Sequence, residues 1–233
     1  MSHPARRRLS AGWPTVPGRV AEVLQAIAVG APPPADGAVE VVPQPPGPVA
    51  GVLAFDSHHI VAADVDPAWV HDLLPAGDLS APLHPAFLGA LAQRLDRPWD
   101  NLDAVFLGHG EAGDVLLPLQ EVDADHAHPR VARAHAYRLE PTVWELPGGD
   151  GFVILGRGLS GRWEAAYEVD PAHRGRGLGR LLIRSTRRLV PVDEPVFLQV
   201  APGNVSSTRA VLAAGGFAPI GAEVLLPGVG AAG

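Results

Sequence analysis

Residues 169–182 read VDPAHRGRGLGRLL, which predicts the end of a strand, a glycine-spaced turn and the start of a helix. The preceding segment, 162–169, has the apolar and aromatic content of a strand, and leucines recur at helical spacing after the turn. Gly175, Gly177 and Gly179 leave the backbone bare, so N–H groups of the turn and of the helix N-terminus can point at an anion. Three arginines add full positive charges: Arg174, Arg176 and Arg180. The segment therefore predicts a binding site for a pyrophosphate group.

Two well-known glycine motifs do not fit this turn. The dinucleotide fingerprint G-x-G-x-x-G needs a third glycine where this chain has an arginine, and the phosphate-loop motif needs a lysine, which the chain lacks. The pattern that does fit is Arg-x-x-Gly-x-Gly at Arg174, Gly177 and Gly179, five residues after Val169. In this motif the chain resembles the GNAT superfamily, the acetyl-CoA-dependent N-acetyltransferases.

A second motif lies in the right order and at the right spacing. After a strand-like run at 196–200, residues 203–209 read GNVSSTR, and an apolar helix then leads to Gly-Gly-Phe at 215–217 and a further strand-like run. This resembles the second GNAT signature, in which an asparagine, here Asn204, begins a helix that ends at Gly-Phe before the last strand. The two signatures together cover roughly residues 130–226.

The resemblance implies an α/β (α+β) fold of GNAT type, with a mixed, mostly antiparallel central sheet and flanking helices. The domain organisation expected is a loose tail over 1–14, an N-terminal α/β region of unknown role over 15–125, and a GNAT acetyltransferase domain over 126–233. The N-terminal region carries no motif that names a function. It is either a degenerate companion domain or a set of elaborated early elements of the same fold.

Local patterns predict most elements in both regions. The N-terminal region has helical patterns at 19–29, at 67–74 with Asp66 as its cap, and at 85–95, and strand patterns at 39–42, 52–55, 60–63 and 104–107. In the C-terminal region a short helix follows Pro129, and strands are predicted at 142–146 and 152–156, before the long strand that ends at Val169.

Composition excludes several classes of protein. The 233 residues are 47% hydrophobic, which is enough for a substantial core, and the chain has no cysteine, which excludes disulfides, a thiolate nucleophile and a cysteine-ligated zinc. No run of about 18 apolar residues occurs, and the basic start of the chain has no apolar run behind it, so we expect a soluble cytoplasmic protein with no membrane partner. His58-His59 and the histidines and aspartates of 123–128 lack the fixed spacing of a zinc site, so no metal is expected.

Charge divides unevenly between the two halves. Residues 1–128 hold 6 arginines and 16 acidic residues, a net charge of −10, whereas residues 129–233 hold 12 arginines and 9 acidic residues, a net charge of +3. A basic half suits the polyanionic coenzyme A; the acidic half either attracts a cationic amine or is an ordinary solvated surface. So acidic a chain disfavours nucleic acid as a partner.

The resemblance implies direct transfer of an acetyl group from acetyl-CoA to a primary amine of a small molecule or a protein. In the family, the strand before the pyrophosphate loop separates from its parallel neighbour, and its backbone amides hold the pantetheine arm and the acetyl oxygen. This places that function on residues 167–169 here, with Asn204 against the cofactor arm. The full set of cofactor-binding residues that the resemblance implies is Tyr167, Val169, Arg174, Gly175, Arg176, Gly177, Leu178, Gly179, Arg180 and Asn204.

Proton transfer is less well defined by the sequence. An alkyl amine with a pKa near 10 must lose a proton before it attacks, and Glu164 and Glu168 lie on the right strand to accept it. The alternative for each is a strand carboxylate that pairs with a neighbouring arginine. Many family members protonate the departing thiolate with a tyrosine, but the corresponding positions here are Val211 and Leu212, and the only tyrosines are Tyr137 and Tyr167.

Three explanations of the missing tyrosine remain open: water protonates the thiolate, another residue does so, or the protein is a weak catalyst. The last leads to a second function, a CoA-binding regulatory module of the same fold without turnover. His173 is interpreted as a loop surface residue, and Trp144 and Trp163 as core or cleft wall. The sequence defines neither the acceptor amine nor the oligomeric state, and a homodimer is compatible with it.

Overall fold

The structure, a computed structural model, describes residues 18–99, 101–123 and 127–228. The predicted loose tail, 1–14, lies outside the described residues. The described residues form ten strands: β1 Val39–Val42, β2 Val49–Phe55, β3 His58–Ala62, β4 Leu102–His109, β5 Gln120–Val122, β6 Leu139–Glu145, β7 Gly151–Arg157, β8 Trp163–Val169, β9 Pro195–Val200 and β10 Phe217–Pro227. Six α-helices lie in the same ranges: α1 Arg19–Ala28, α2 Pro67–Leu73, α3 Pro85–Leu95, α4 Pro129–Tyr137, α5 Leu178–Leu189 and α6 Val205–Ala214.

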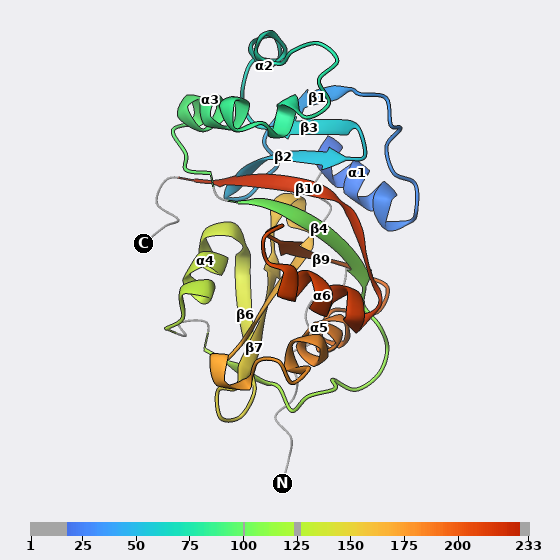
Figure 1. The fold of residues 1–233 in the computed structure, drawn as a ribbon, viewed down its shortest axis with the longest axis vertical. Helices are drawn as coiled ribbons and strands as arrows, with labels where there is room; N and C mark the ends of the chain where they lie inside the picture. Colours follow the sequence, from blue (N-terminus) through green and yellow to red (C-terminus); the bar gives the residue numbers. More distant parts are fainter. Residues whose placement is uncertain (1–17, 100, 124–126, 229–233) are drawn as a thin grey trace.

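All ten described strands form one sheet, in the order β1-β3-β2-β10-β4-β9-β8-β7-β6-β5. Among the described strands seven of the nine neighbouring pairs are antiparallel, and the two parallel pairs are β1 with β3 and β8 with β9. Figure 1 shows the N-terminal elements at one end of this sheet and α4, α5 and α6 at the other. The expected mixed, mostly antiparallel sheet with flanking helices is therefore confirmed.

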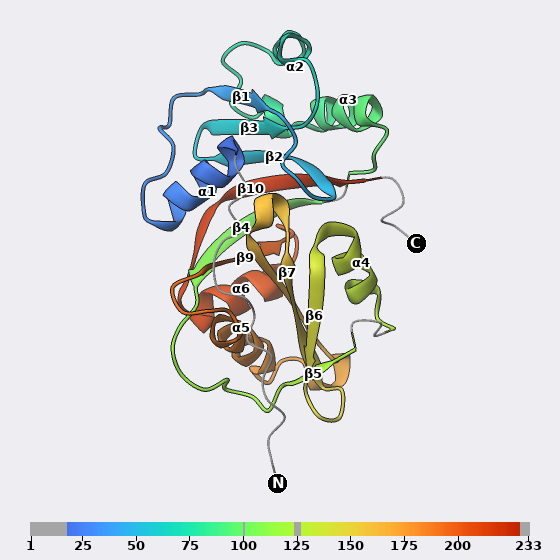
Figure 2. The same ribbon diagram turned by 180° about the vertical axis from the view of Figure 1, so that it is seen from behind.

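Helices cover both faces because side chains alternate between the faces of each strand. On β9, Leu198 packs with α5 and α6, whereas the adjacent Phe197 packs with α1. On β7, Val153 points to the α5 side and Ile154 to α4. Thus α5 and α6 lie on one face, and α1 and α4 on the other; Figure 2 shows α1 beside β2 and β10. Trp144 and Trp163 are buried among the residues of the α5 side, as the sequence predicted.

Local sequence signals explain where the helices begin. Asp66 Oδ1 accepts the N–H of Ala68 at 2.9 Å, and Pro67 occupies the first helical position of α2. Asn204 caps α6 in the same manner, with its Oδ1 accepting the N–H of Ser207 at 3.1 Å. These helices therefore begin where their local patterns place them, and the strand patterns at 52–55 and 60–63 fall in the antiparallel pair β2 and β3.

One strand of the N-terminal region lies inside the C-terminal part of the sheet. β4 pairs with β10 on one side and with β9 on the other, both antiparallel. Strand order depends on contacts far apart in sequence, so the pattern at 104–107 predicted the strand but not this position. One sheet therefore contains strands from both sides of the predicted domain boundary. The division into domains at 15–125 and 126–233 stays a prediction.

The two parallel strands separate part of the way along their length. β8 and β9 are paired from Trp163 and Val196 to Ala165 and Leu198, and no pair follows among the described residues. The rest of β8 stays paired with β7 only, up to Val169 opposite Gly151. A gap therefore opens in the sheet beside residues 166–169, at the end of β8 that leads into the glycine-rich turn.

Candidate functional site

The glycine-rich turn connects the open end of β8 to α5. After Val169 the chain forms a short 3-10 helix, Pro171–His173, and Gly175 and Gly177 then take φ values of 78° and 85°, which favour glycine. Gly177 is the N-cap of α5, and within the described chain no side chain caps this helix. The first N–H groups of α5 therefore remain available to an anion, together with the positive end of the helix dipole.

A cavity of about 570 Å³ lies against this turn, and we call it the loop pocket. Nine of the ten cofactor-binding residues that the sequence implied line it: Tyr167, Val169, Arg174, Gly175, Gly177, Leu178, Gly179, Arg180 and Asn204. Arg176 is exposed and does not line the pocket. Arg130 of α4 and Arg209 of α6 add positive charge that the sequence did not indicate, because both come from distant segments.

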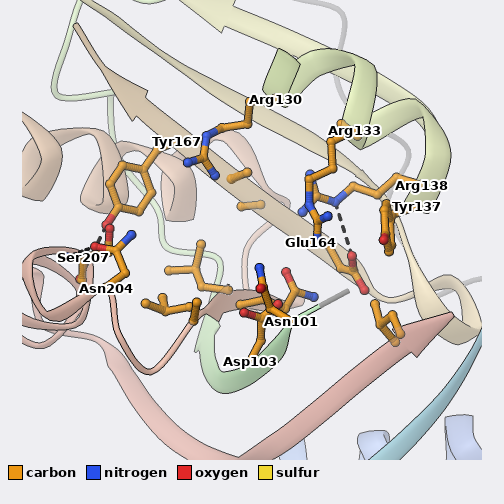
Figure 3. Close-up of a pocket in the computed structure, with 18 residues that line it drawn as sticks. Asn101, Asp103, Arg130, Arg133, Tyr137, Arg138, Glu164, Tyr167, Asn204 and Ser207 are labelled. Carbon is orange, nitrogen blue, oxygen red and sulfur yellow. Dashed lines mark hydrogen bonds and ion pairs between the residues drawn. The ribbon is translucent and has the colours of Figure 1, made fainter. Parts of the chain in front are cut away.

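A second cavity, of about 220 Å³, lies on the gap between β8 and β9, and we call it the sheet pocket. It shares Arg130, Tyr167, Asn204 and Ser207 with the loop pocket, so the two cavities adjoin. Figure 3 shows Tyr167, Asn204 and Ser207 together at one end of the sheet pocket and Glu164 with Arg138 at the other. A ligand that extends from the glycine-rich turn along β8 would reach the sheet pocket at Tyr167.

Asn204 and Tyr167 form the shared wall. Oδ1 of Asn204 accepts hydrogen bonds from Ser207 N at 3.1 Å and Ser206 Oγ at 3.0 Å. The side-chain NH2 of Asn204 has no hydrogen-bond partner among residues 18–99, 101–123 and 127–228, so it can donate to a ligand. The Tyr167 hydroxyl lies 3.5 Å from the carbonyl oxygen of Ser207, and burial raises the pKa of Tyr167. The phenol is therefore protonated at neutral pH.

Tyr167 supplies a phenol to both pockets, whereas Val211 and Leu212, the helix positions at which many family members have a tyrosine, supply none. Val211 is fully buried in the core and Leu212 is exposed, so neither helix residue can act on a ligand in the pockets as a proton donor. The resemblance assigned Tyr167 only a backbone role, because the direction of its side chain depends on contacts with residues distant in sequence, such as Ser207.

Glu164, one of the two predicted bases, is buried in a network of charges. Arg162 Nε donates to its Oε1 at 2.8 Å, Arg138 Nε donates to its Oε2 at 3.2 Å, and the N–H of Leu159 also reaches Oε1. Burial opposes the ionisation of Glu164, but the two guanidinium groups outweigh it and hold the pKa of this carboxyl below its usual value. A Cβ at Gly158 would overlap the Glu164 carboxyl group, so this glycine makes room for it.

Glu168, the other predicted base, is also paired with arginines. Arg130 Nε lies 2.9 Å from Oε2, and Arg174 Nη2 lies 2.9 Å from Oε1. Burial raises the pKa of Glu168, whereas both arginines lower it, with a net shift downward. Both glutamates thus have the arginine partners of the alternative interpretation, and the assignment of either as the base stays a prediction.

Asp103 of β4 is a site residue that the sequence did not indicate. It lines the sheet pocket and lies opposite Glu223 of β10 in the sheet register. Burial, followed by the negative charges of Glu223 and Glu164, raises the pKa of Asp103 from 3.8 to about 6. Its carboxylate has no hydrogen bond or ion pair with any residue that the structure describes. The only available signal was an acidic residue at the start of the 104–107 strand pattern, which says nothing of its neighbours.

The remaining histidines lie away from both pockets or at their rim. His58 is buried and forms hydrogen bonds with Asp36 at 3.0 Å and Glu40 at 2.8 Å. His173 lies at the edge of the loop pocket, partly exposed. The described residues contain no group of three or more histidine, aspartate or glutamate side chains that could hold a metal ion, and 124–126 lie outside them. None of the helices described is both long and apolar enough to cross a bilayer.

Comparisons with known proteins give similarities of fold only. No protein-family model and no curated protein matches the sequence. The chain is similar to a GNAT-family acetyltransferase from Colwellia psychrerythraea, with 13% identity and a TM-score of 0.39 over 61% of this chain and 62% of that one. It is also similar to a GCN5-related N-acetyltransferase from Kribbella flavida, with 16% identity and a TM-score of 0.37 over 63% and 65% of the chains.

A third solved structure matches a longer part of the chain. It is a tandem GNAT protein from the clavulanic acid biosynthesis pathway, with 16% identity and a TM-score of 0.35 over 76% of this chain and 62% of that one. The matched region spans less than two thirds of the length of each of these three proteins.

Proposed function

We propose that the chain is a GNAT-type N-acetyltransferase that moves an acetyl group from acetyl-CoA to a primary amine by direct attack. One observation carries the proposal: an uncapped helix N-terminus behind a glycine-rich turn opens into a pocket that meets a second pocket where β8 and β9 separate. The first feature suits a pyrophosphate, and the second provides free strand edges beside a cavity in which an amine can meet a thioester.

The residues present fit coenzyme A by charge and by hydrogen-bonding capacity. Arg130, Arg174, Arg180 and Arg209 line the loop pocket, together with the first turn of α5. The unpaired side-chain NH2 of Asn204 suits the amide carbonyls of the pantetheine arm. The edge of β8 beyond Ala165 is not paired with β9 and lies on the same path, although the N–H of Val169 already donates to Glu168 Oε1 at 3.3 Å. When bound, acetyl-CoA supplies the acetyl group as a thioester.

Tyr167 is the residue we assign to the proton donor of the reaction. Its phenol lies in the wall that both pockets share, and its raised pKa keeps the proton on the oxygen until a stronger base develops. The sulfur of the departing thiol becomes such a base as the carbon–sulfur bond breaks. In this role Tyr167 takes the place of the helix tyrosine that Val211 and Leu212 do not provide.

A regulatory module that binds coenzyme A without turnover is the second candidate. The lowered pKa values of Glu164 and Glu168, each paired with arginines, favour it, because a strongly neutralised carboxylate is a weak proton acceptor.

Calorimetry and a thiol assay separate the two functions. We expect acetyl-CoA to bind with a measurable heat, and free thiol to form above the no-protein rate with at least one of propylamine, ethanolamine, putrescine, glycinamide or a peptide with a free N-terminus. Binding without thiol release for every amine would support the regulatory module. No binding of acetyl-CoA would contradict both functions.

A further inference from the structure

Four adjacent strands place one polar side chain each on the same face of the sheet. In the register of the sheet, Glu223 of β10 is opposite Asp103 of β4, and Gln199 of β9 is opposite Val105, two residues along β4. Glu164 of β8 is opposite Phe197, two residues from Gln199. Because side chains two apart on a strand share a face, these four polar groups form a row beneath α4. We call Glu164, Gln199, Asp103 and Glu223 the polar row.

The two ends of the polar row are neutralised from within the protein. Arg162 is 0% exposed and forms ion pairs with both Glu164 and Glu223. Arg138 adds a second cation to Glu164, and Gln199 Nε2 donates to Glu223 Oε1 at 3.2 Å. Buried carboxylates without such partners are strongly unfavourable, so this pairing offsets the cost of burying Glu164 and Glu223.

Asp103 is the carboxylate of the row that no cation of the described residues neutralises. It faces Glu223 on β10 and Glu164 on β8, which repel its negative charge. Three charged or titratable side chains of α4 and one from the residue after it line the same pocket: Arg130, Arg133 and Tyr137, and then Arg138. Arg130 is paired with Glu168, Arg138 with Glu164, and the Arg133 guanidinium lies 4.3 Å from the ring of Tyr137. Figure 3 shows Asp103 across the pocket from Arg133 and Arg138.

The neighbouring Glu223, which does not itself line the sheet pocket, also has one oxygen without a donor among the residues that the structure describes. Glu223 is 1% exposed, and within the described part of the chain its Oε2 is buried without a hydrogen-bond partner. An ammonium group beside Asp103 would supply positive charge and three N–H donors to a carboxylate that has no such partner among the described residues. The cavity of about 220 Å³ limits the ligand to a small molecule or to one end of a chain.

We propose that the sheet pocket is the acceptor site, and that Asp103 binds the ammonium group of a small primary amine there and accepts its proton. This inference rests on the proposed acetyl transfer, because Tyr167, in the wall of the same pocket, places the cofactor arm next to the amine. It makes Asp103 a catalytic residue, and it leaves Glu164 as a positioning residue that Arg162 and Arg138 hold in place.

The proton and bond changes balance as follows. Asp103 takes one proton from the ammonium group, and the neutral nitrogen then forms a bond to the acetyl carbon while the carbon–sulfur bond breaks. The Tyr167 phenol gives its proton to the sulfur and is reprotonated by the second proton that the nitrogen loses. Asp103 releases its proton to water. Ammonium plus acetyl-CoA thus gives an N-substituted acetamide, free coenzyme A and one proton.

The pH dependence of Asp103→Asn tests the catalytic role. For the amine that the wild-type protein acetylates best, we expect kcat/KM to rise with pH through about 6, because Asp103 must be ionised to accept a proton. The D103N variant should lose at least about 100-fold in kcat/KM and lose this rise, while its calorimetric affinity for acetyl-CoA stays within about twofold. Asp103→Glu should recover part of the activity.

The matched control is Asp193→Asn. Asp193 is an exposed residue with φ 64° in the turn before β9, a conformation that asparagine tolerates, and it lines neither pocket. It should retain wild-type rates and the wild-type pH profile. The inference is overturned if D103N keeps kcat/KM within about threefold of wild type with the same pH profile, or if its affinity for acetyl-CoA falls in step with its activity.

A thermal-shift measurement tests the ammonium site at Asp103 without knowledge of the natural acceptor. Propylammonium chloride at pH 8 should raise the Tm of the wild-type protein more than tetramethylammonium chloride of equal ionic strength, because the latter has no N–H donor, and D103N should show no such difference. An equal difference in D103N, or none in wild type, would overturn the inference. A wild-type protein that releases no thiol with any amine would instead refute the acetyl transfer, with the ammonium site still decided by this measurement.

Discussion

At the scale of single residues, Asp103 should make the stability of the protein depend on pH. Its pKa is 3.8 in the unfolded reference and about 6 in the folded protein, so between these values the folded state binds more protons than the unfolded state. Binding of this proton stabilises the folded protein fully below about pH 4. As pH rises through about 6, the Asp103 carboxyl group ionises and this stabilisation of the folded state is lost. At pH 8 we expect D103N to be more stable than wild type by about 2 kcal/mol, measured by urea unfolding.

The same measurement at pH 4 is the control. There the folded wild-type protein carries a neutral side chain at position 103, as D103N does, so most of the gain in the free energy of unfolding should disappear. A D103N variant that is less stable than wild type at pH 8 would show that the aspartate has a structural role. A gain in stability together with a loss of activity is typical of a functional residue held in an unfavourable environment.

The sequence indicated the residues of the loop pocket better than those of the sheet pocket. Nine of the ten predicted cofactor residues lie together beside one pocket, because they belong to two short segments whose glycines and cap act locally, and their role in cofactor binding stays a prediction. It gave no indication of Asp103, because the raised pKa comes from Glu223 and Glu164, which are distant in sequence. For Glu164 the sequence left open a base and a carboxylate paired with a neighbouring arginine, and the two arginines that lower its pKa are Arg162 and Arg138.

At the scale of elements, the N-terminus of α5 should control cofactor binding through Gly179. A Cβ at this position would lie 3.6 Å from Tyr167 Cε2 and 3.7 Å from Val169 Cγ2, which is ordinary contact. We therefore expect Gly179→Ala to bind acetyl-CoA with near wild-type affinity. Gly179→Leu should lose at least about tenfold in calorimetric affinity, because its longer side chain extends among the residues that line the loop pocket.

The Tm of the two Gly179 variants is the control for misfolding. Both leucine and alanine have higher helix propensity than glycine, so neither variant should lower Tm. A leucine variant with wild-type affinity for acetyl-CoA would show that the cofactor does not follow the surface between α5 and β8. A lowered Tm would mean that the loss of affinity reports misfolding.

Elements with local signals could be predicted, and elements defined by distant contacts could not. The helix α3 occupies 85–95 and the strand β1 occupies 39–42, as their patterns indicated. The edge strand β5 was missed, because it has three residues, two of them exposed, and forms only by pairing with β6. The separation of β8 and β9 came from the resemblance, because no property of either strand alone determines where the pairing stops.

At the scale of the whole molecule, the position of β4 bears on whether residues 126–233 form a domain. β4 lies between β9 and β10, and its Phe106 packs in the core on the α5 side. A fragment of residues 126–233 would leave β9 and β10 without this neighbour, so we expect no cooperative thermal unfolding by circular dichroism, whereas the full chain unfolds cooperatively. A cooperative transition in the fragment would instead confirm the predicted domain boundary.

The position of β4 in the sheet also affects the order in which the parts of the sheet can form. Its last residue, His109, leaves the ribosome long before Pro195 begins β9 and Phe217 begins β10. During synthesis this strand has neither of its sheet neighbours, so its apolar side chains remain in a partly collapsed chain until β9 and β10 have been made. The closing step of folding joins segments that are distant in sequence, which favours slow folding after release and a greater need for chaperones than the length of the chain alone suggests.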